Sequence, residues 1–62
     1  MTTGYFYDAD THAIIDIVKG SYDDIVRQLH NYDEDTTGLA FSKYEGSSDA
    51  LFETSKTRTI NI

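Results

Sequence analysis

Residues 12–32, HAIIDIVKGSYDDIVRQLHNY, contain the two strongest structural signals of the chain. The β-branched side chains of residues 12–18 predict a strand. Gly20 ends this strand, and Ser21 followed three positions later by Asp24 is close to the capping box that begins many helices. The segment therefore predicts a strand that is joined by a short break to a helix.

Apolar positions indicate which faces of these two elements are buried. In the helical part they recur at intervals of three and four, at Tyr22, Ile25, Val26, Leu29 and Tyr32. This spacing predicts an amphipathic helix from about residue 21 to about residue 31. In the strand, Ala13, Ile15 and Ile17 share one face, and we expect that face to be buried.

Strand signals also lie on both sides of this unit. GYFYD at 4–8 is aromatic, while GLAFSKYE at 38–45 and ALFETSKTRTINI at 50–62 alternate apolar and polar side chains. The predicted order is strand, strand, helix, strand, strand, in a single domain that spans residues 1–62. One apolar helix stripe suits one sheet face, so we expect an α+β fold with the helix packed on an antiparallel sheet.

Composition restricts the function classes. The chain has 62 residues, no cysteine and a net charge of −6, which excludes disulfides and thiolate metal sites. An excess of acid repels nucleic acid and anionic membranes and attracts basic proteins. The chain opens without a secretory signal, and its longest apolar run is AII at 13–15. We therefore expect a soluble cytoplasmic protein without a membrane segment.

The stretch NYDEDTTG at 31–38 partly matches a calcium-binding loop. That loop needs an oxygen ligand at its fifth position and a bidentate glutamate at its twelfth. Counted from Asp33, these positions are Thr37 and Tyr44, and Glu45 falls one place late. The template fails, and we expect neither a metal site nor a cofactor.

No catalytic arrangement is visible in the sequence. His12 and His30 have no adjacent nucleophile or orienting group, and the four glycines are scattered rather than gathered in a phosphate-binding loop. Basic residues gather only in KTR at 56–58, which is too few for a phosphate-binding surface. We expect neither enzymatic activity nor direct binding of nucleic acid.

The predicted topology gathers acidic residues at one end of the sheet. The turn between the first two strands carries Asp8 and Asp10, and the helix runs back toward that turn. A helix of this length covers about 16 Å, which leaves Asp33, Glu34 and Asp35 near the turn. Carboxylates placed after a helix C-terminus face the negative end of its dipole, so folding does not require them. A basic partner surface is the simplest explanation for them.

The same topology predicts a second acidic group at the opposite end of the sheet. There we expect Glu45 and Asp49 near Asp23 and Asp24. The last two lie in the first helical turn, where the dipole favours negative charge, so stability alone explains them.

Size, charge and element order give the chain a resemblance to a functional group of proteins. A cysteine-free, strongly acidic chain of 62 residues with this order resembles small phage-encoded anti-defence inhibitors of the anti-CRISPR and anti-restriction type. The segment GLAFSKYEGSSDALFET at 38–54 has the apolar–turn–apolar hairpin pattern of some members. The resemblance implies a protein that covers a basic nucleic-acid-binding surface in the host cytoplasm, in some cases by mimicking nucleic acid.

The leading hypothesis is a non-enzymatic protein that binds and blocks a basic surface of a host protein or nucleoprotein complex. The expected contacts are the five carboxylates of the first acidic group and two aromatic side chains, Asp8, Asp10, Asp33, Glu34, Asp35, Tyr32 and Tyr7. The alternative is a structural or assembly module that forms a homodimer through a sheet edge. The threonine-rich final strand is the candidate edge.

Overall fold

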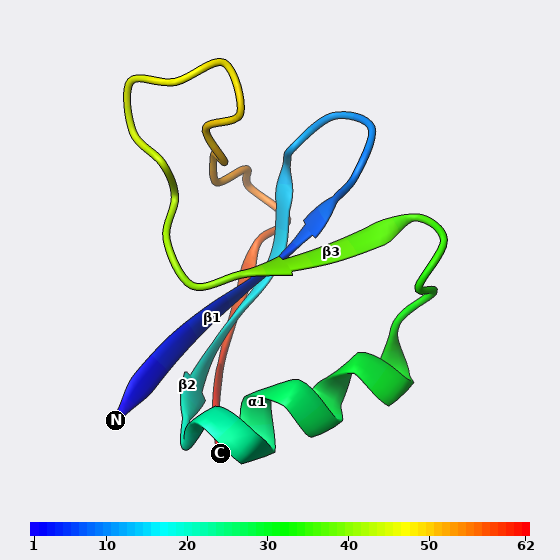
Figure 1. The fold of residues 1–62 in the computed structure, drawn as a ribbon, viewed down its shortest axis with the longest axis vertical. Coiled ribbons are helices and arrows are strands. Elements are labelled where there is room, and N and C mark those ends of the chain that lie inside the picture. The colour runs from blue at the N-terminus through cyan, green and yellow to red at the C-terminus, as the bar shows by residue number, and fades with distance from the viewer.

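The computed structural model describes residues 1–62 and shows one helix against a four-stranded mixed sheet (Figure 1). In chain order the elements are β1 (Thr2–Asp8), β2 (Ile14–Gly20), α1 (Tyr22–Arg27), the 3-10 helix η1 (Gln28–Asn31), β3 (Thr37–Ala40) and β4 (Arg58–Asn61). The predicted α+β class, the order of elements and the packing of the helix on the sheet are confirmed.

The strands lie in the order β3-β1-β2-β4. β1 pairs antiparallel with β2 and with β3, whereas β4 runs parallel to β2. The expectation of a wholly antiparallel sheet is therefore wrong at one edge. β3 and β4 run in the same direction, and parallel strands need a long crossover, which is the irregular segment 41–57.

An irregularity in β2 changes which of its side chains are buried. Tyr7 pairs with Ile14 and Phe6 pairs with Asp16, so Ile15 has no partner on β1. A bulge of this kind shifts the alternation of side chains by one residue. Ile14 and Asp16 are fully buried, while Ile15 is 36% exposed. The buried face predicted for this strand is therefore wrong at Ile15, whereas Ile17 is buried as predicted.

Apolar side chains cover both faces of the sheet. Those buried on the side of the helix are Phe6, Val18 and Ile25, with Tyr32, Leu39 and Ile60 packed around them. Those buried in the second group are Ile14, Ile17, Ala40 and Leu51, with Tyr5 and Tyr7 packed around them. Leu51 belongs to the segment 41–57, so this irregular segment provides a second layer that the sequence did not predict.

Ser21 begins the helix as predicted. Its hydroxyl accepts a hydrogen bond from the backbone N–H of Asp24 at 3.2 Å and donates one to the carboxylate of Asp24 at 2.8 Å. The last turn narrows to η1, which ends at Asn31, the predicted end of the helix. Ile25 is fully buried over Gly4, where an added Cβ would lie 2.5 Å from the Ile25 Cγ2 atom. Glycine at this position therefore allows the helix to approach β1.

The two C-terminal strands are shorter than predicted. The predicted strands 38–45 and 50–62 form β3 and β4 over four residues each. Between them Tyr44 and Gly46 have φ angles of 52° and 83°. This left-handed backbone is incompatible with a strand, so the chain turns after β3 instead of continuing along the sheet.

Candidate acidic interface

The turn between β1 and β2 holds the first two acidic residues of the predicted site. The carboxylate of Asp8 accepts hydrogen bonds from the backbone N–H groups of Asp10 at 2.8 Å and Thr11 at 3.2 Å. The N–H of His12 donates to the backbone carbonyl of Asp8 at 2.8 Å. Asp8 therefore shapes the turn. Asp10 is exposed, and its carboxylate accepts no hydrogen bond.

The loop after η1 holds the other three acidic residues. The carboxylate of Asp33 accepts a hydrogen bond from the N–H of Asp35 at 2.9 Å. Its backbone carbonyl accepts bonds from Thr36 at 3.1 Å and Thr37 at 2.9 Å. Asp33 therefore shapes this loop, while the side chains of Glu34 and Asp35 are exposed and make no hydrogen bond.

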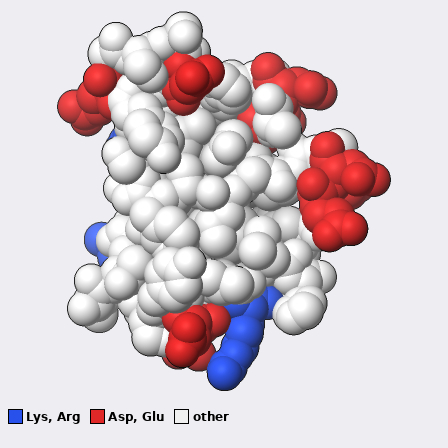
Figure 2. Space-filling view, in the orientation of Figure 1, with Lys and Arg blue, Asp and Glu red and all other residues white.

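One backbone hydrogen bond joins the two acidic turns. The N–H of Ala9 donates to the carbonyl of Thr36 at 2.9 Å, and beside it Asp8 pairs with Thr37 in the β1–β3 ladder. The predicted proximity of the first turn to the chain after the helix is confirmed, and Figure 2 shows acidic side chains over both turns. We use the name acidic end for Asp8, Asp10, Asp33, Glu34 and Asp35.

No ion pair neutralises the acidic end. The three ion pairs of the protein use other carboxylates and join Arg27 to Asp24, Lys43 to Glu53, and Arg58 to Asp16. Five of the eleven acidic residues therefore stand together without a cationic partner. Asp10, Glu34 and Asp35 contribute no side-chain bond to the fold, so the fold does not explain them.

The two aromatic residues of the predicted site have structural contacts. The ring of Tyr32 stacks on Phe6 with 4.2 Å between the centroids, and its hydroxyl donates to the carboxylate of Asp16. Tyr7 is half-buried in the second apolar group and meets the ring of His12 edge-on at 6.0 Å. Packing accounts for both tyrosines, which leaves the carboxylates as the exposed part of the site.

The second acidic group is not where the sequence predicted it. After β3 the chain turns back, and Phe52 pairs with Ala13 beside the β1–β2 turn. The loop that carries Glu45 and Asp49, yellow in Figure 1, therefore lies at the opposite end of the molecule from α1. The expectation that these two acids lie near the first turn of α1 is wrong, because it assumed that strand 38–45 continues along the sheet.

A buried carboxylate forms a network that no sequence motif indicated. Asp16 is fully buried in β2 and accepts hydrogen bonds from the hydroxyl of Tyr32 and from Arg58 Nε at 2.9 Å and Nη2 at 3.3 Å. These bonds compensate the cost of removing a charge from water. The available signal was a single aspartate inside the apolar run 13–18, which regular alternation placed on the outer face.

Two members of this network have perturbed pKa values. Burial, together with the hydrogen bond to Asp16, raises the pKa of Tyr32 well above its usual range. The hydrogen bond to the same carboxylate raises the pKa of the Arg58 guanidinium. Tyr32 therefore remains a neutral donor and Arg58 a cation around neutral pH.

Alkaline pH is expected to destabilise the protein through Tyr32. An unfolded tyrosine loses its proton near about pH 10, whereas folded Tyr32 retains it because its pKa is raised. The unfolded state then binds fewer protons than the folded state, so the free energy of unfolding falls as the pH rises. Urea midpoints measured from about pH 8 to about pH 11 should fall more steeply for the wild type than for Tyr32→Phe. Parallel curves would contradict this role of Tyr32.

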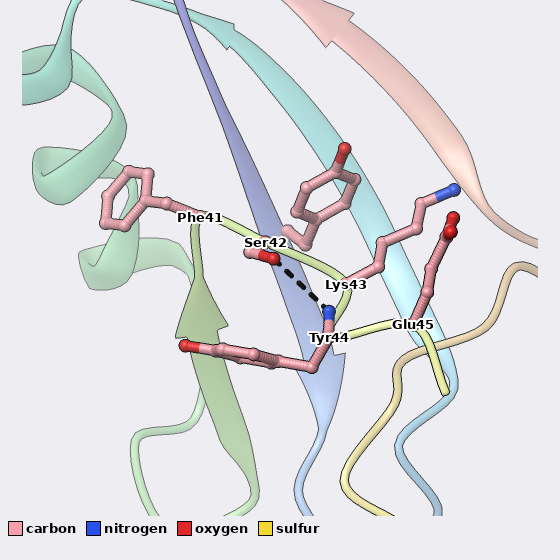
Figure 3. Close-up of a pocket in the computed structure, with 6 residues that line it drawn as sticks. Phe41, Ser42, Lys43, Tyr44 and Glu45 are labelled. Atoms are coloured by element: carbon pink, nitrogen blue, oxygen red, sulfur yellow. Dashed lines mark hydrogen bonds between the residues drawn. The ribbon is translucent and has the colours of Figure 1, made fainter. Parts of the chain in front are cut away.

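A pocket of about 450 Å³ lies at the end of β3 (Figure 3). It is lined by the side chains of Tyr5, Phe41, Ser42, Lys43, Tyr44 and Glu45. Figure 3 shows the rings of Phe41 and Tyr44 on one side of the chain segment 41–45. The side chains of Lys43 and Glu45 project to the other side. The pocket therefore combines exposed aromatic faces with a charged rim.

Lys43 is held by a partner outside the pocket lining. Its Nζ atom lies 2.7 Å from a carboxylate oxygen of Glu53 and 5.6 Å from the ring centroid of Tyr5. The hydrogen bond to Glu53 raises the pKa of Lys43, and the charge of Glu45 acts in the same direction. Lys43 is therefore paired with Glu53, and Glu45 has no ion pair.

Similarity to other proteins does not assign a role to these features. No group of three or more His, Asp or Glu side chains is placed to hold a metal ion, and no helix has the length and apolar character to cross a membrane. No family model matches the chain, and no curated protein or solved structure is significantly similar to it. The acidic end is therefore the feature from which a function is best inferred.

Proposed function

We propose that the protein is a non-enzymatic inhibitor that binds a basic, nucleic-acid-binding surface of a larger complex and blocks it. It would act in the manner of the anti-CRISPR and anti-restriction proteins that it resembles. The observation that carries this proposal is the acidic end. Five carboxylates from two turns are joined through the hydrogen bond between Ala9 and Thr36, and none of them belongs to an ion pair.

The energetics of the acidic end favour a role in binding over a role in folding. Glu34 and Asp35 follow the C-terminal end of η1, where the helix dipole disfavours negative charge. Interactions between exposed charges are worth roughly a few tenths of a kcal/mol each, so the fold tolerates them without needing them. A basic partner surface would make the same charges favourable and would accelerate association.

The turns also present these charges in a fixed arrangement. The carboxylates of Asp8 and Asp33 bind backbone N–H groups of their own turns, and the backbone bond from Ala9 fixes one turn against the other. A surface that is ordered before binding loses less conformational entropy when the partner arrives. The acidic end is therefore suited to recognise a fixed pattern of basic groups.

Charge reversal at the acidic end is expected to weaken partner binding at least about tenfold without loss of thermal stability. The variant Asp10→Lys with Glu34→Lys changes one exposed residue in each turn. Wild type and variant are immobilised to capture partners from a candidate host lysate. The affinity of the captured, purified complex is then measured at low and high salt. We expect the partner to bind nucleic acid and to be released by it.

A matched variant separates the acidic end from net charge. Asp23→Lys with Asp49→Lys makes the same change in net charge at two exposed positions outside the acidic end. This control is expected to bind within about threefold of the wild type, because long-range attraction alone is screened by salt. Equal loss of affinity in the two double variants would show that the position of the carboxylates is irrelevant and would overturn the proposal.

A further inference from the structure

The N-terminal half of β1 has a free edge. β3 pairs with β1 only from Tyr5 onward, and the chain leaves β1 after Ala40. The preceding residues, from Thr2 to Gly4, pair with β2 on their other side. A strand with one unpaired edge can accept another extended segment.

Thr3 presents its backbone at this edge. Its partner on β2 is Lys19, whose carbonyl accepts the N–H of Ile62 at 2.8 Å and so points away from β1. In an antiparallel ladder, two opposed residues either point their N–H and C=O groups toward each other or point them away from each other. The N–H and C=O of Thr3 therefore point to the free edge, and no hydrogen bond joins them to the chain after Ala40.

The aromatic pocket adjoins the same edge. Tyr5, the β1 residue paired with Ala40, lines the pocket. Phe41 lies over the neighbouring Gly4, where an added Cβ would be 3.7 Å from the Phe41 Cε1 atom. Successive residues of a strand face opposite sides of the sheet. The pocket therefore reaches both sides of the β1 edge, where side chains of an added strand would alternate.

Tyr44 is held in position at the mouth of this pocket. Its φ of 52° is an unfavourable conformation for a bulky side chain, and Tyr44 is 56% exposed. Its N–H donates to the hydroxyl of Ser42 at 3.2 Å (Figure 3), and its carbonyl accepts the N–H of Ser47 at 3.2 Å. These bonds stabilise the left-handed turn from which the exposed ring projects.

The charges at the pocket favour a cationic occupant. Lys43 is the one cation in the lining and is bound by Glu53 at 2.7 Å, whereas the carboxylate of Glu45 has no ion pair or hydrogen bond. Glu45 is therefore available to pair with a second positive group. On the other side of the segment, the exposed ring of Tyr44 offers an apolar surface to a neighbouring side chain of the same ligand.

We propose that the free edge of β1 at Thr3 and the adjoining pocket bind an extended peptide segment of a partner protein through its backbone and one arginine or lysine side chain. The backbone of the segment continues the line of β3 and pairs with Thr3. Because its side chains alternate between the two sides of the sheet, an apolar neighbour packs on the ring of Tyr44, and the basic side chain lies on the other side with its charged head beside Glu45. This surface is separate from the acidic end and does not depend on the function proposed for it.

A blocked pentapeptide, acetyl-Thr-Val-Arg-Val-Thr-amide, is the probe for this surface. In an NMR titration of the wild type, amide hydrogen exchange at Thr3 is expected to slow at least about tenfold at saturation, because its N–H gains a partner. Tyr44→Ala should weaken binding roughly tenfold, as expected for an aromatic anchor. Replacing the probe arginine by leucine should weaken binding and remove its salt dependence.

Matched variants identify the contacts. Phe52→Ala removes another exposed ring, and Asp49→Asn removes another exposed carboxylate, so neither should change affinity for the probe. Glu45→Gln should weaken binding roughly threefold relative to Asp49→Asn. Thr3→Pro removes the N–H at the free edge, a position where an edge strand tolerates proline, and should abolish binding.

Two results would overturn the inference. One is an unchanged exchange rate of the Thr3 amide in wild-type protein at millimolar probe. Because this measurement uses the wild type, it tests the inference even if Thr3→Pro does not fold. The other is equal affinity of Tyr44→Ala and Phe52→Ala for the probe. The double variant Asp10→Lys with Glu34→Lys should bind the probe within about threefold of the wild type. Failure of the acidic end as a binding surface is therefore distinguishable from failure of this one.

Discussion

Replacing Phe6 with alanine is expected to remove most of the free energy of unfolding. Phe6 is fully buried, stacks on Tyr32, and shares the core on the side of the helix with Val18 and Ile25. Truncation of a buried phenylalanine costs about 3–5 kcal/mol. A chain of 62 residues has a total free energy of unfolding of only about 3–9 kcal/mol. The loss is therefore comparable with the whole stability.

Urea unfolding followed by circular dichroism measures this effect. Phe52→Ala is the matched control, because it makes the same chemical change at a residue that is 49% exposed. The control should lose less than about half as much stability, in proportion to the smaller apolar area that it buries. A Phe6→Ala protein with the same midpoint as Phe52→Ala would contradict the assignment of Phe6 to the core.

Replacing Asp16 with alanine is expected to lower the free energy of unfolding by about 3 kcal/mol. The carboxylate is fully buried and accepts bonds from both Tyr32 and Arg58. Hydrogen bonds to a charged group contribute about 1.5–3 kcal/mol each, and their loss leaves the Tyr32 hydroxyl without its acceptor. The same substitution is expected to release β4, because Asp16 pairs with Arg58 in the β2–β4 ladder.

Two further variants test the origin of this effect. Asp16→Asn keeps an acceptor of the same shape without the charge and should have intermediate stability. Asp49→Ala removes an exposed carboxylate and should change stability by less than about 0.5 kcal/mol. Amide exchange in β4 should accelerate in Asp16→Ala more than exchange in β1. Uniform acceleration in all strands would show that Asp16 does not act on β4 in particular.

The strand–helix unit of residues 12–32 was predictable because its signals are local. Gly20 ends the strand, the side chain of Ser21 caps the helix, and the apolar spacing runs to the end of η1. The bulge at Ile15 was not predictable in this way, because it depends on how β2 pairs with β1. The burial of Asp16 likewise depends on Arg58, which lies 42 positions away.

The path of residues 41–57 accounts for most of the remaining differences. Alternation predicted strands here, but the left-handed backbone of Tyr44 and Gly46 turns the chain, and Leu51 is buried in the second apolar group. An alternating pattern indicates that some side chains are buried, but it does not show which surface of the protein they pack against. The parallel pairing of β4 follows from this path and has no local signal.

The candidate site was predictable where its position depends on the strand–helix unit of residues 12–32. The meeting of the two acidic turns follows from the hairpin and the length of the helix, and the bond between Ala9 and Thr36 confirms it. The positions of Glu45 and Asp49 depend on the crossover and were predicted wrongly. The free edge at Thr3 depends on where β3 leaves β1, which the alternating sequence after Gly38 did not reveal.

The parallel pairing of β4 with β2 also affects how the chain can fold. β1, β2 and α1 are neighbours in sequence and can associate early, whereas β4 must close a loop across the whole crossover. Until it arrives, Asp16 has no cationic partner, and burying its charge is unfavourable. Docking of β4 is therefore expected to be the last step of folding, and its release the first step of unfolding. The charge of Asp16 links both steps, because its burial is favourable only while β4 is docked.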